Sequence, residues 1–425
     1  MNDRTAPIEH LLRAEAPQVL GALVRRFGQF DIAEDAVQEA LIAASRAWPA
    51  DGVPENPRSW LIRVGYRKMV DLLRSDQARR RREQEAGLAE LAMHEPAREA
   101  GPPPDTDDSL TLLLLCCHPA LSTTSQVSLT LRAVGGLTTA EIAHAYGTSE
   151  TTMGTRISRA KQQLASAGAR LTPPTDDDRA SRVAAVMQVL YLIFNEGYTT
   201  SSGNELTRVD LTHEAIRLAH MLRDTLPPDD AMTAEATGLL ALMLLTEARR
   251  PARTGADGEL VPLEKQDRTR WQAGLIREGT ALIDTVWHRR EIGPYQLQAA
   301  IAAVHNTAES PERTDWPQIA ALYLWLERLA PTAPVRLSRV VAVAQAYGPG
   351  RGLALLDDLN QRHHLDQNPL THQRERAVRA HLLQMTGDTT DAAALYREAA
   401  TLTDNHVEQR YLHDKANRLD PPDRR

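Results

Sequence analysis

The chain has 425 residues, a formal net charge of −7 at pH 7 and only 4% aromatic residues. This length accommodates two or three domains, and two cysteines cannot build the disulfide framework of a small secreted protein. Its longest apolar run, LTLLLLCC, is far shorter than a membrane span, and its N-terminus lacks the basic start and apolar core of a signal peptide. We therefore expect a soluble, cytoplasmic protein with no membrane partner, and the scarcity of aromatic residues favours an all-α fold.

Residues 27–49 and 54–82 are predicted to form two helices of opposite charge. In the second helix Asn56 is the N-cap and Pro57 takes the first helical position. Between residues 58 and 82 nine Lys or Arg residues stand against two acids, which favours nucleic-acid binding because phosphate neutralisation releases counterions. The acids expected at exposed positions of the first helix are Asp31, Glu34, Asp35 and Glu39. The charged residues that share one face of the second helix are Arg63, Arg67, Asp71 and Arg74.

Two aromatic residues of the basic helix have alternative roles. Trp60 and Tyr66 have rings able to stack on unpaired bases. A place in the hydrophobic core is the other interpretation, and for Trp60 we favour the core.

Residues 83–108 are predicted to be a linker, because eight acids stand against one Arg and the segment contains the run Pro102, Pro103, Pro104. The acidity of this segment would repel DNA phosphates. A disordered tether with no contact role is the open alternative.

Residues 132–164 are predicted to form two short amphipathic helices joined at a glycine, the pattern of a helix-turn-helix DNA reader. Thr138 and Glu141 have the spacing of a capping box, so the first helix begins directly after Thr138. Gly147 is expected to supply the positive φ of the turn. Ser149 is expected to cap the second helix.

The second helix of this pair has one buried stripe and one polar face. The residues of the stripe are Met153, Ile157, Ala160 and Leu164. The opposite face carries hydroxyls, amides and cations suited to base edges and phosphates in a major groove. These residues are Thr151, Thr152, Thr155, Arg156, Arg159 and Gln162. An ordinary helical hairpin with a solvated polar face is the alternative.

An acidic helix, a basic helix and a helix-turn-helix in this order resemble the sigma factors of the extracytoplasmic-function group, which direct bacterial RNA polymerase to promoters. The resemblance implies that 27–49 binds core polymerase, that the segment NPRSWLIRVGYRKMVDLLR reads the minus-ten element, and that 110–164 is the minus-thirty-five domain. The equivalent linker in the family threads through polymerase near the nascent RNA. Many family members carry Asn where this chain has Tyr66, so the promoter sequence does not transfer.

The functional roles of the family are carried over residue by residue. The resemblance implies polymerase binding by Asp31, Glu34, Asp35, Gln38 and Glu39. The residues implied to face the melted minus-ten strand, where cations serve single-stranded DNA, are Arg63, Arg67, Lys68 and Arg74. The residues implied to face the minus-thirty-five duplex are Glu150, Thr151, Thr152, Thr155, Arg156 and Arg159.

The remaining half of the chain is predicted to be helical throughout, after a domain boundary at the Pro-rich, acidic segment 171–178. Residues 376–403 resemble a tetratricopeptide unit with Gly387 at the interhelical turn. Residues 340–359 resemble such a unit more weakly, with Gly348 at the turn. Helix pairs of this kind bury a face only against their neighbours and form a superhelix with a concave surface. Such a surface usually serves a protein partner.

The segment YLIFNEGYTTSSG, residues 191–203, matches a signature of the subgroup of these sigma factors that carries a tetratricopeptide-like C-terminal extension. With this segment the resemblance covers the whole chain. Gly197 is expected to end a helix in the left-handed conformation. Glu196 is interpreted as tying a loop to the preceding helix or to the sigma domains, rather than as a catalytic residue.

The sequence gives little support for a metal site or a phosphate-binding loop. Cys116, Cys117 and His118 are adjacent, and a structural zinc site would need two further ligands, so buried small residues are the default. The segment GPGRG at 348–352 lacks the Lys and the Ser or Thr of a P-loop. We therefore expect no metal, no cofactor and no catalytic activity.

The sequence thus predicts an all-α sigma factor with a region 2-like domain at 8–82, an acidic linker at 83–108, a region 4-like domain at 109–170 and an α-solenoid-like tetratricopeptide-type domain at 179–425. Its expected partners are core RNA polymerase, promoter DNA and a protein on the C-terminal domain, which regulates activity or contacts partners. The alternative is a free-standing helix-turn-helix regulator with a tetratricopeptide sensor. A third interpretation, an enzyme in the C-terminal half, lacks a constellation of nucleophile, base and orienting group.

Overall fold

The computed structural model describes residues 5–85, 108–146, 148–169, 176–200, 207–228, 230–256, 258–288, 292–368 and 371–420. Within these ranges the chain forms nineteen α-helices and three short 3-10 helices, and Thr254 and Leu260 pair in an isolated antiparallel bridge. The predicted all-α fold is confirmed. The chain divides into two compact units, Met1–His144 with Thr148–Val189, and Leu190–Arg425 with Ala145–Gly147.

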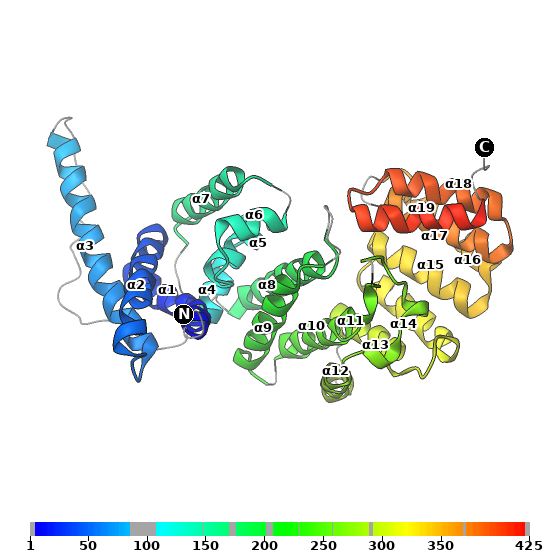
Figure 1. Ribbon diagram of the computed structural model, residues 1–425, viewed down its shortest axis with the longest axis horizontal. Helices are drawn as coiled ribbons and strands as arrows, with labels where there is room; N and C mark the ends of the chain where they lie inside the picture. Colours follow the sequence, from blue (N-terminus) through cyan, green and yellow to red (C-terminus); the bar gives the residue numbers. More distant parts are fainter. Residues whose placement is uncertain are drawn as a thin grey trace. The chain divides into compact units, whose positions relative to one another are not determined.

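The first unit opens with three long helices that pack on one another (Figure 1). They are α1 (Thr5–Phe27), α2 (Phe30–Asp51) and α3 (Pro57–Glu85). The predicted N-cap of α3 is present, because Asn56 Oδ1 accepts a hydrogen bond from Ser59 N at 2.9 Å. The sharp turn from α1 to α2 uses Gly28 at a φ of +71°, a conformation that favours glycine.

Four shorter helices complete the main part of the first unit: α4 (Ser109–Cys116), α5 (Thr123–Ala133), α6 (Thr139–Ala145) and α7 (Glu150–Ser166). The helix α4 contacts both α1 and α5, and four of its leucines, residues 112–115, are buried. Asp108, the N-cap residue of α4, forms an ion pair with Arg25 of α1 at 2.8 Å. Most of the predicted linker 83–108, from 86 to 107, lies outside the described residues.

The division between the units falls inside α8 (Asp176–Tyr198). In the first half of α8, Arg182 Nη2 donates a hydrogen bond to the carbonyl oxygen of Leu114 in α4 at 3.0 Å. The first unit therefore includes the early turns of α8, beyond the Pro-rich segment 171–178.

The second unit is an array of helices in which, from α12 to α19, each helix packs on the next (Figure 1). Its α-helices after α8 are α9 (Val209–Thr225), α10 (Ala231–Glu247), α11 (Arg250–Arg253), α12 (Ala273–Trp287), α13 (Pro294–Thr307), α14 (Trp316–Leu329), α15 (Ala333–Tyr347), α16 (Pro349–His363), α17 (His372–Thr386), α18 (Thr389–Thr401) and α19 (His406–Leu419). The 3-10 helices are η1 (Leu263–Lys265), η2 (Arg268–Arg270) and η3 (Pro311–Arg313).

Both helix pairs predicted from the sequence are present in this array. The helices α15 and α16 meet at Gly348, and α17 and α18 meet at Gly387. The two glycines have φ angles of +99° and +91°, which L-residues with a side chain rarely adopt. Gly348 and Gly387 thus form the interhelical turns, as predicted from the sequence.

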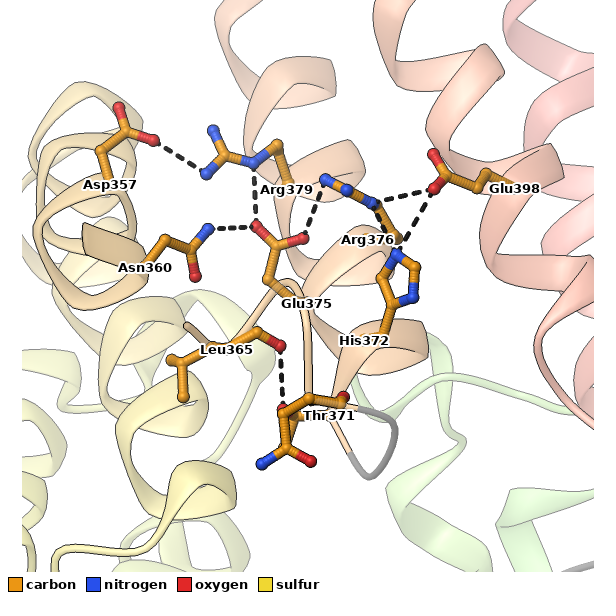
Figure 2. Close-up of polar contacts among 10 residues, drawn as sticks. Asp357, Asn360, Leu365, Thr371, His372, Glu375, Arg376, Arg379 and Glu398 are labelled. Atoms are coloured by element: carbon orange, nitrogen blue, oxygen red, sulfur yellow. Dashed lines mark hydrogen bonds and ion pairs between the residues drawn. The ribbon is translucent and has the colours of Figure 1, made fainter. Parts of the chain in front are cut away.

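A buried carboxylate joins three helices of the array (Figure 2). Glu375 of α17 is 0% exposed and accepts hydrogen bonds from Asn360 Nδ2 of α16 and from Arg379 Nε, both at 2.9 Å. Arg376 contacts Glu375 at 3.3 Å and also reaches Glu398 of α18 at 3.0 Å. Because a buried charge is tolerated only when it is paired and hydrogen-bonded, this network fixes how α17 sits between its neighbours.

Candidate functional site

The starts of α6 and α7 follow the sequence prediction. Thr138 N donates a hydrogen bond to Glu141 Oε2 at 2.7 Å, and Glu141 N donates one to Thr138 Oγ1 at 3.1 Å, which is a capping box. Ser149 Oγ caps α7 by accepting from Thr152 N at 3.2 Å. Gly147, for which a positive φ is predicted, lies outside the described residues.

The helix α7 separates a buried stripe from an exposed polar face. The stripe is the predicted one, each member being no more than 4% exposed: Met153, Ile157, Ala160 and Leu164. The six predicted DNA-facing residues all reach the surface, Arg156 partly and the others fully: Glu150, Thr151, Thr152, Thr155, Arg156 and Arg159. Thr155 Oγ1 donates to the carbonyl oxygen of Thr151 at 2.9 Å, so this hydroxyl is held against its own helix while it stays accessible.

The basic helix α3 presents a second cationic surface. Arg63, Arg67 and Arg74 are exposed, and none of them forms an ion pair with a residue in the described ranges. Lys68 differs, because its Nζ lies 3.4 Å from Glu39 Oε2 of α2. An exposed ion pair of this kind contributes roughly 0 to 1 kcal/mol, so Lys68 can exchange Glu39 for a phosphate at little cost.

The two aromatic residues of α3 pack against the neighbouring helices. Trp60 meets Trp48 of α2 edge-on, with ring centroids 5.5 Å apart, and Tyr66 lies 5.5 Å from Phe27 of α1. Both residues are half-buried. Trp60 thus packs against Trp48 without being fully buried in the core, and both rings fasten α3 to the neighbouring helices.

Four of the five predicted polymerase-binding residues are exposed along α2, namely Asp31, Asp35, Gln38 and Glu39. Partial burial and then the neighbouring carboxylates, Glu34 first among them, raise the pKa of Asp35. A crowded acidic face of this kind is stabilised by a cationic partner.

Glu34 does not have the exposed position expected from the sequence. It is only 8% exposed, Arg132 Nε of α5 donates to its Oε1 at 2.7 Å, and Lys161 Nζ of α7 contacts its Oε2. Lys161 Nζ also lies 3.4 Å from Asp31 Oδ1. The expectation was wrong because the two cations that cover Glu34 are 98 and 127 residues away in the chain, and no local spacing in α2 indicates them.

The end of α8 corrects a second expectation. Gly197 does not end the helix in the left-handed conformation, because α8 continues through it to Tyr198. A Cβ at Gly197 would lie 2.7 Å from Thr212 N and 2.9 Å from the carbonyl oxygen of Arg208. This glycine is therefore needed for the close approach of the start of α9, and Arg208 N donates to the carbonyl oxygen of Gly197 at 2.6 Å.

The residues that follow Gly197 are bound by distant parts of the second unit. Arg253 of α11 stacks on the Tyr198 ring, with its guanidinium carbon 4.0 Å from the centroid, and its Nη2 donates to Thr199 Oγ1 at 2.5 Å. Asn405 Nδ2, ahead of α19, donates to the carbonyl oxygen of Thr200 at 2.9 Å. The 191–203 signature thus forms a structural junction as far as Thr200, and residues 201–206 lie outside the described ranges.

Cys116 and Cys117 are the remaining residues singled out from the sequence. Cys116 and Cys117 are buried free thiols, and burial raises the pKa of the Cys117 thiol to about 12. In the described part of the chain, no three His, Cys, Asp or Glu side chains gather as metal ligands. No helix of that part combines the length and the apolar character needed to cross a membrane.

Three protein families match this chain. Sigma-70 region 2 matches residues 11–80, which begin inside α1 and end inside α3. Sigma-70 region 4 matches residues 111–164, which begin inside α4 and end inside α7. A family of unknown function (DUF6596) matches residues 182–287, beginning inside α8.

One relative matches nearly the whole chain, and two others match part of it. An uncharacterized protein of Rhizobium meliloti (strain 1021) is 40% identical over 417 residues, which are 98% of this chain and 96% of that protein. The ECF RNA polymerase sigma factor SigG of Mycobacterium tuberculosis is 28% identical over 271 residues, 58% of this chain and 67% of the relative. The probable ECF RNA polymerase sigma factor SigI of that organism is 29% identical over 163 residues, 37% of this chain and 54% of the relative. No solved structure matches the chain.

Proposed function

The chain belongs to the extracytoplasmic-function group of sigma-70 RNA polymerase sigma factors, and we propose that α2 binds core polymerase while α3 and α7 meet the two promoter elements. The observation that supports this most is the pairing of a capped helix-turn-helix with a separate cationic helix in one compact unit. Promoter recognition needs both surfaces, because one element is read as a duplex and the other as a melted strand.

The side chains of each surface suit its proposed target. On α7 the exposed threonines and Arg156 offer donors and acceptors to base edges in a major groove, and Arg159 adds a cation toward phosphate. On α3 the exposed Arg63, Arg67 and Arg74 suit the backbone of single-stranded DNA. Polymerase then catalyses RNA synthesis, and this chain positions polymerase on the promoter.

The acidic face of α2 is the proposed polymerase contact, and it separates a sigma factor from a free-standing regulator. We expect the double variant Asp35→Lys and Glu39→Lys to bind promoter-length DNA as before and to lose binding to core polymerase, because both residues are exposed. Fluorescence anisotropy with labelled DNA and with core polymerase measures the two affinities. Asp224→Lys, at an exposed acid of α9, is the matched charge-reversal control. Unchanged polymerase binding in the double variant would overturn the assignment.

A role of Glu34 in polymerase binding depends on the ion pairs that cover it. Its carboxylate is covered by Arg132 and Lys161, so the polymerase-binding role carried over to Glu34 requires that these ion pairs break. We expect Lys161→Met, which keeps the length of the side chain and removes its charge, to bind core polymerase more tightly than the natural chain. Lys161→Arg, which retains the pair, is the control. Equal affinities for all three proteins would show that the ion pairs do not compete with polymerase.

For the second unit we propose a regulatory role exerted through a protein partner. The helix α14 supports it by exposing Leu324, Trp325 and Leu329, with Trp325 51% and Leu329 53% accessible. Large exposed apolar groups on one helix are typical of interaction surfaces, and tryptophan is prominent among residues that dominate binding energy. Pull-down from a cell extract with the full chain and with Trp325→Ala tests this role, and an unchanged set of bound proteins would contradict the assigned surface.

A further inference from the structure

A cavity of about 430 Å³ lies in the second unit between the segment 259–265 and one face of α19. The α19 residues that line it are three or four positions apart, as on one face of a helix, from Val407 to Arg418. Leu260, Val261 and Pro262 provide an apolar wall opposite. A volume between roughly 300 and 1,000 Å³ is typical of sites for small molecules. We name this cavity the α19 groove.

The α19 groove is cationic in an acidic protein. Four cations line it, and two carboxylates, those of Glu259 and Asp414, lie among them. None of the four cations forms an ion pair with a residue that the structure describes. They are Lys265, Arg410, Lys415 and Arg418.

Lys415 is the most desolvated of these cations. Its Nζ lies 5.5 Å from the ring centroid of Tyr396 and 5.8 Å from that of Tyr411. Burial lowers the pKa of Lys415, and the nearby Glu264 carboxylate offsets this in part. An ammonium group held against aromatic rings and partly removed from water gains more from an anion than one that is fully hydrated.

Both walls of the groove are fixed by contacts within the second unit. The segment that includes Leu260 is held as a hairpin, because Gly255 N donates to the carbonyl oxygen of Glu259 at 2.9 Å and Val261 N donates to that of Arg253 at 2.8 Å. The start of α19 is held by Asn405, which is 1% exposed and binds Thr200. A ligand would therefore enter a site whose walls are already positioned, which reduces the entropy lost on binding.

We propose that the α19 groove binds a small organic anion with an apolar body, either a carboxylate or a phosphate ester. The cations attract the anionic group, and the wall formed by Leu260, Val261 and Pro262 covers the apolar body. The two surfaces together favour this class. An inorganic ion would leave the apolar wall uncovered, and a neutral apolar ligand would leave the excess of positive charge in the groove unbalanced. All residues that line the groove belong to the second unit.

Isothermal titration calorimetry of the full chain with phenyl phosphate and with benzoate tests the proposal and distinguishes the two anion sources. We expect saturable binding of at least one of them at one site per chain, and weaker binding of inorganic phosphate and of phenol. Arg410→Ala and Lys415→Met are each expected to weaken the binding by about fivefold or more, since each removes a charge-assisted contact. Arg328→Ala, at an exposed cation of α14, is the control and should leave the affinity unchanged.

Three results would overturn the proposal. They are the absence of saturable binding by either organic anion, equal affinity in the groove variants and the natural chain, and tighter binding of a hexaglutamate peptide than of both small anions. The last result would assign the groove to an acidic protein segment instead. Circular dichroism of each variant verifies the helical fold, and Arg410 is exposed, so its removal should not disturb that fold.

Discussion

At the scale of single residues, Arg156 tests how α7 reads DNA. If its guanidinium contacts a base edge, Arg156→Ala should cost about 1 to 3 kcal/mol of discrimination at one promoter position. If it contacts phosphate instead, all sequences should lose affinity alike, and the salt dependence should become shallower. Binding titrations against promoters altered one position at a time distinguish these outcomes, and no effect at any position would remove Arg156 from the interface.

His305 of α13 makes the stability of the second unit depend on pH. Burial, and then the nearby cations Arg249 and Arg268, lower the pKa of His305 to about 4, and its ring meets Trp316 edge-on at 5.2 Å. The imidazole of His305 takes up a proton near pH 6.5 in the unfolded chain and only near pH 4 in the folded chain. The neutral form therefore contributes its full stabilisation above pH 6.5, and the free energy of unfolding falls as the pH drops from 6.5 toward 4. The loss due to this one group amounts to up to about 3 kcal/mol.

The variant His305→Phe isolates this contribution, because phenylalanine keeps a ring against Trp316 and does not titrate. We expect its free energy of unfolding, measured by urea denaturation at several pH values, to decline less between pH 6.5 and 4 than that of the natural chain. Parallel pH profiles for the two proteins would show that the imidazole of His305 is not held neutral in the folded state.

Residue positions could be predicted where their partners are close in the sequence. Thr138 and Glu141 are three residues apart, and the hydrogen bonds between them follow from that spacing. Glu34 shows the limit, because the cations that bury it belong to α5 and α7 and become neighbours only when the first unit folds. The pairing of Lys68 with Glu39, between α3 and α2, was missed for the same reason.

At the scale of helices, Gly197 controls how closely α9 approaches α8. A Cβ there would lie 2.7 Å from Thr212 N and 2.8 Å from Leu211 Cβ, and a backbone atom cannot move aside as a flexible side chain can. We expect Gly197→Ala to lower the free energy of unfolding by about 1 to 3 kcal/mol, as overpacking does. Thermal unfolding followed by circular dichroism measures the effect.

Gly350 of α16 supplies the matched control for this prediction. A Cβ at Gly350 would meet nothing within 4 Å. Gly350→Ala should therefore leave stability unchanged or raise it by up to about 1 kcal/mol, because alanine has the higher helix propensity. A similar loss in both variants would mean that the close approach of α9 to α8 does not set the cost.

Helices and their turns could be predicted from local signals, but not every role of a glycine. Gly387 ends α17 in the left-handed conformation, as expected from a glycine between two amphipathic segments. Gly197 gives the same local signal, a glycine after an apolar helix, yet it lies within α8 because the start of α9 packs on it. Nothing in the 191–203 segment itself indicates whether Gly197 ends a helix or allows another helix to pack closely on it.

At the scale of the whole molecule, the end of the first unit decides how the C-terminal part can be removed. A chain that ends at residue 175 loses Arg182 and its hydrogen bond to Leu114, together with the buried Val183 and Val186. A chain that ends at Val189 keeps them. We expect the 1–189 protein to unfold at a higher temperature than the 1–175 protein in differential scanning calorimetry, and equal midpoints would place the boundary before α8.

Truncation at Val189 also tests the regulatory role proposed for the second unit. If that unit regulates, promoter-specific transcription by the 1–189 protein should differ from that of the full chain in amount or in promoter choice. Identical transcription from both proteins would contradict the proposal, provided that the shorter protein remains folded.

The domain order of the molecule could be predicted because each part has its own composition: an acidic and a basic helix, then a helix-turn-helix, then a helical array. The contacts between distant residues within the helical array could not be predicted from the sequence. Arg253 and Asn405 bind residues 198–200 from positions far along the chain, and the buried Glu375 depends on helices α16 and α18 on either side. Such contacts follow from the packing of the array and leave no mark in local periodicity.

Run-off transcription with purified core RNA polymerase on a pool of genomic promoters, with and without this protein, measures whether the chain acts as a sigma factor. We expect discrete new start sites that require this protein and disappear in the Asp35→Lys, Glu39→Lys variant. DNA binding that persists while no new start site forms would contradict a sigma factor and favour a free-standing regulator.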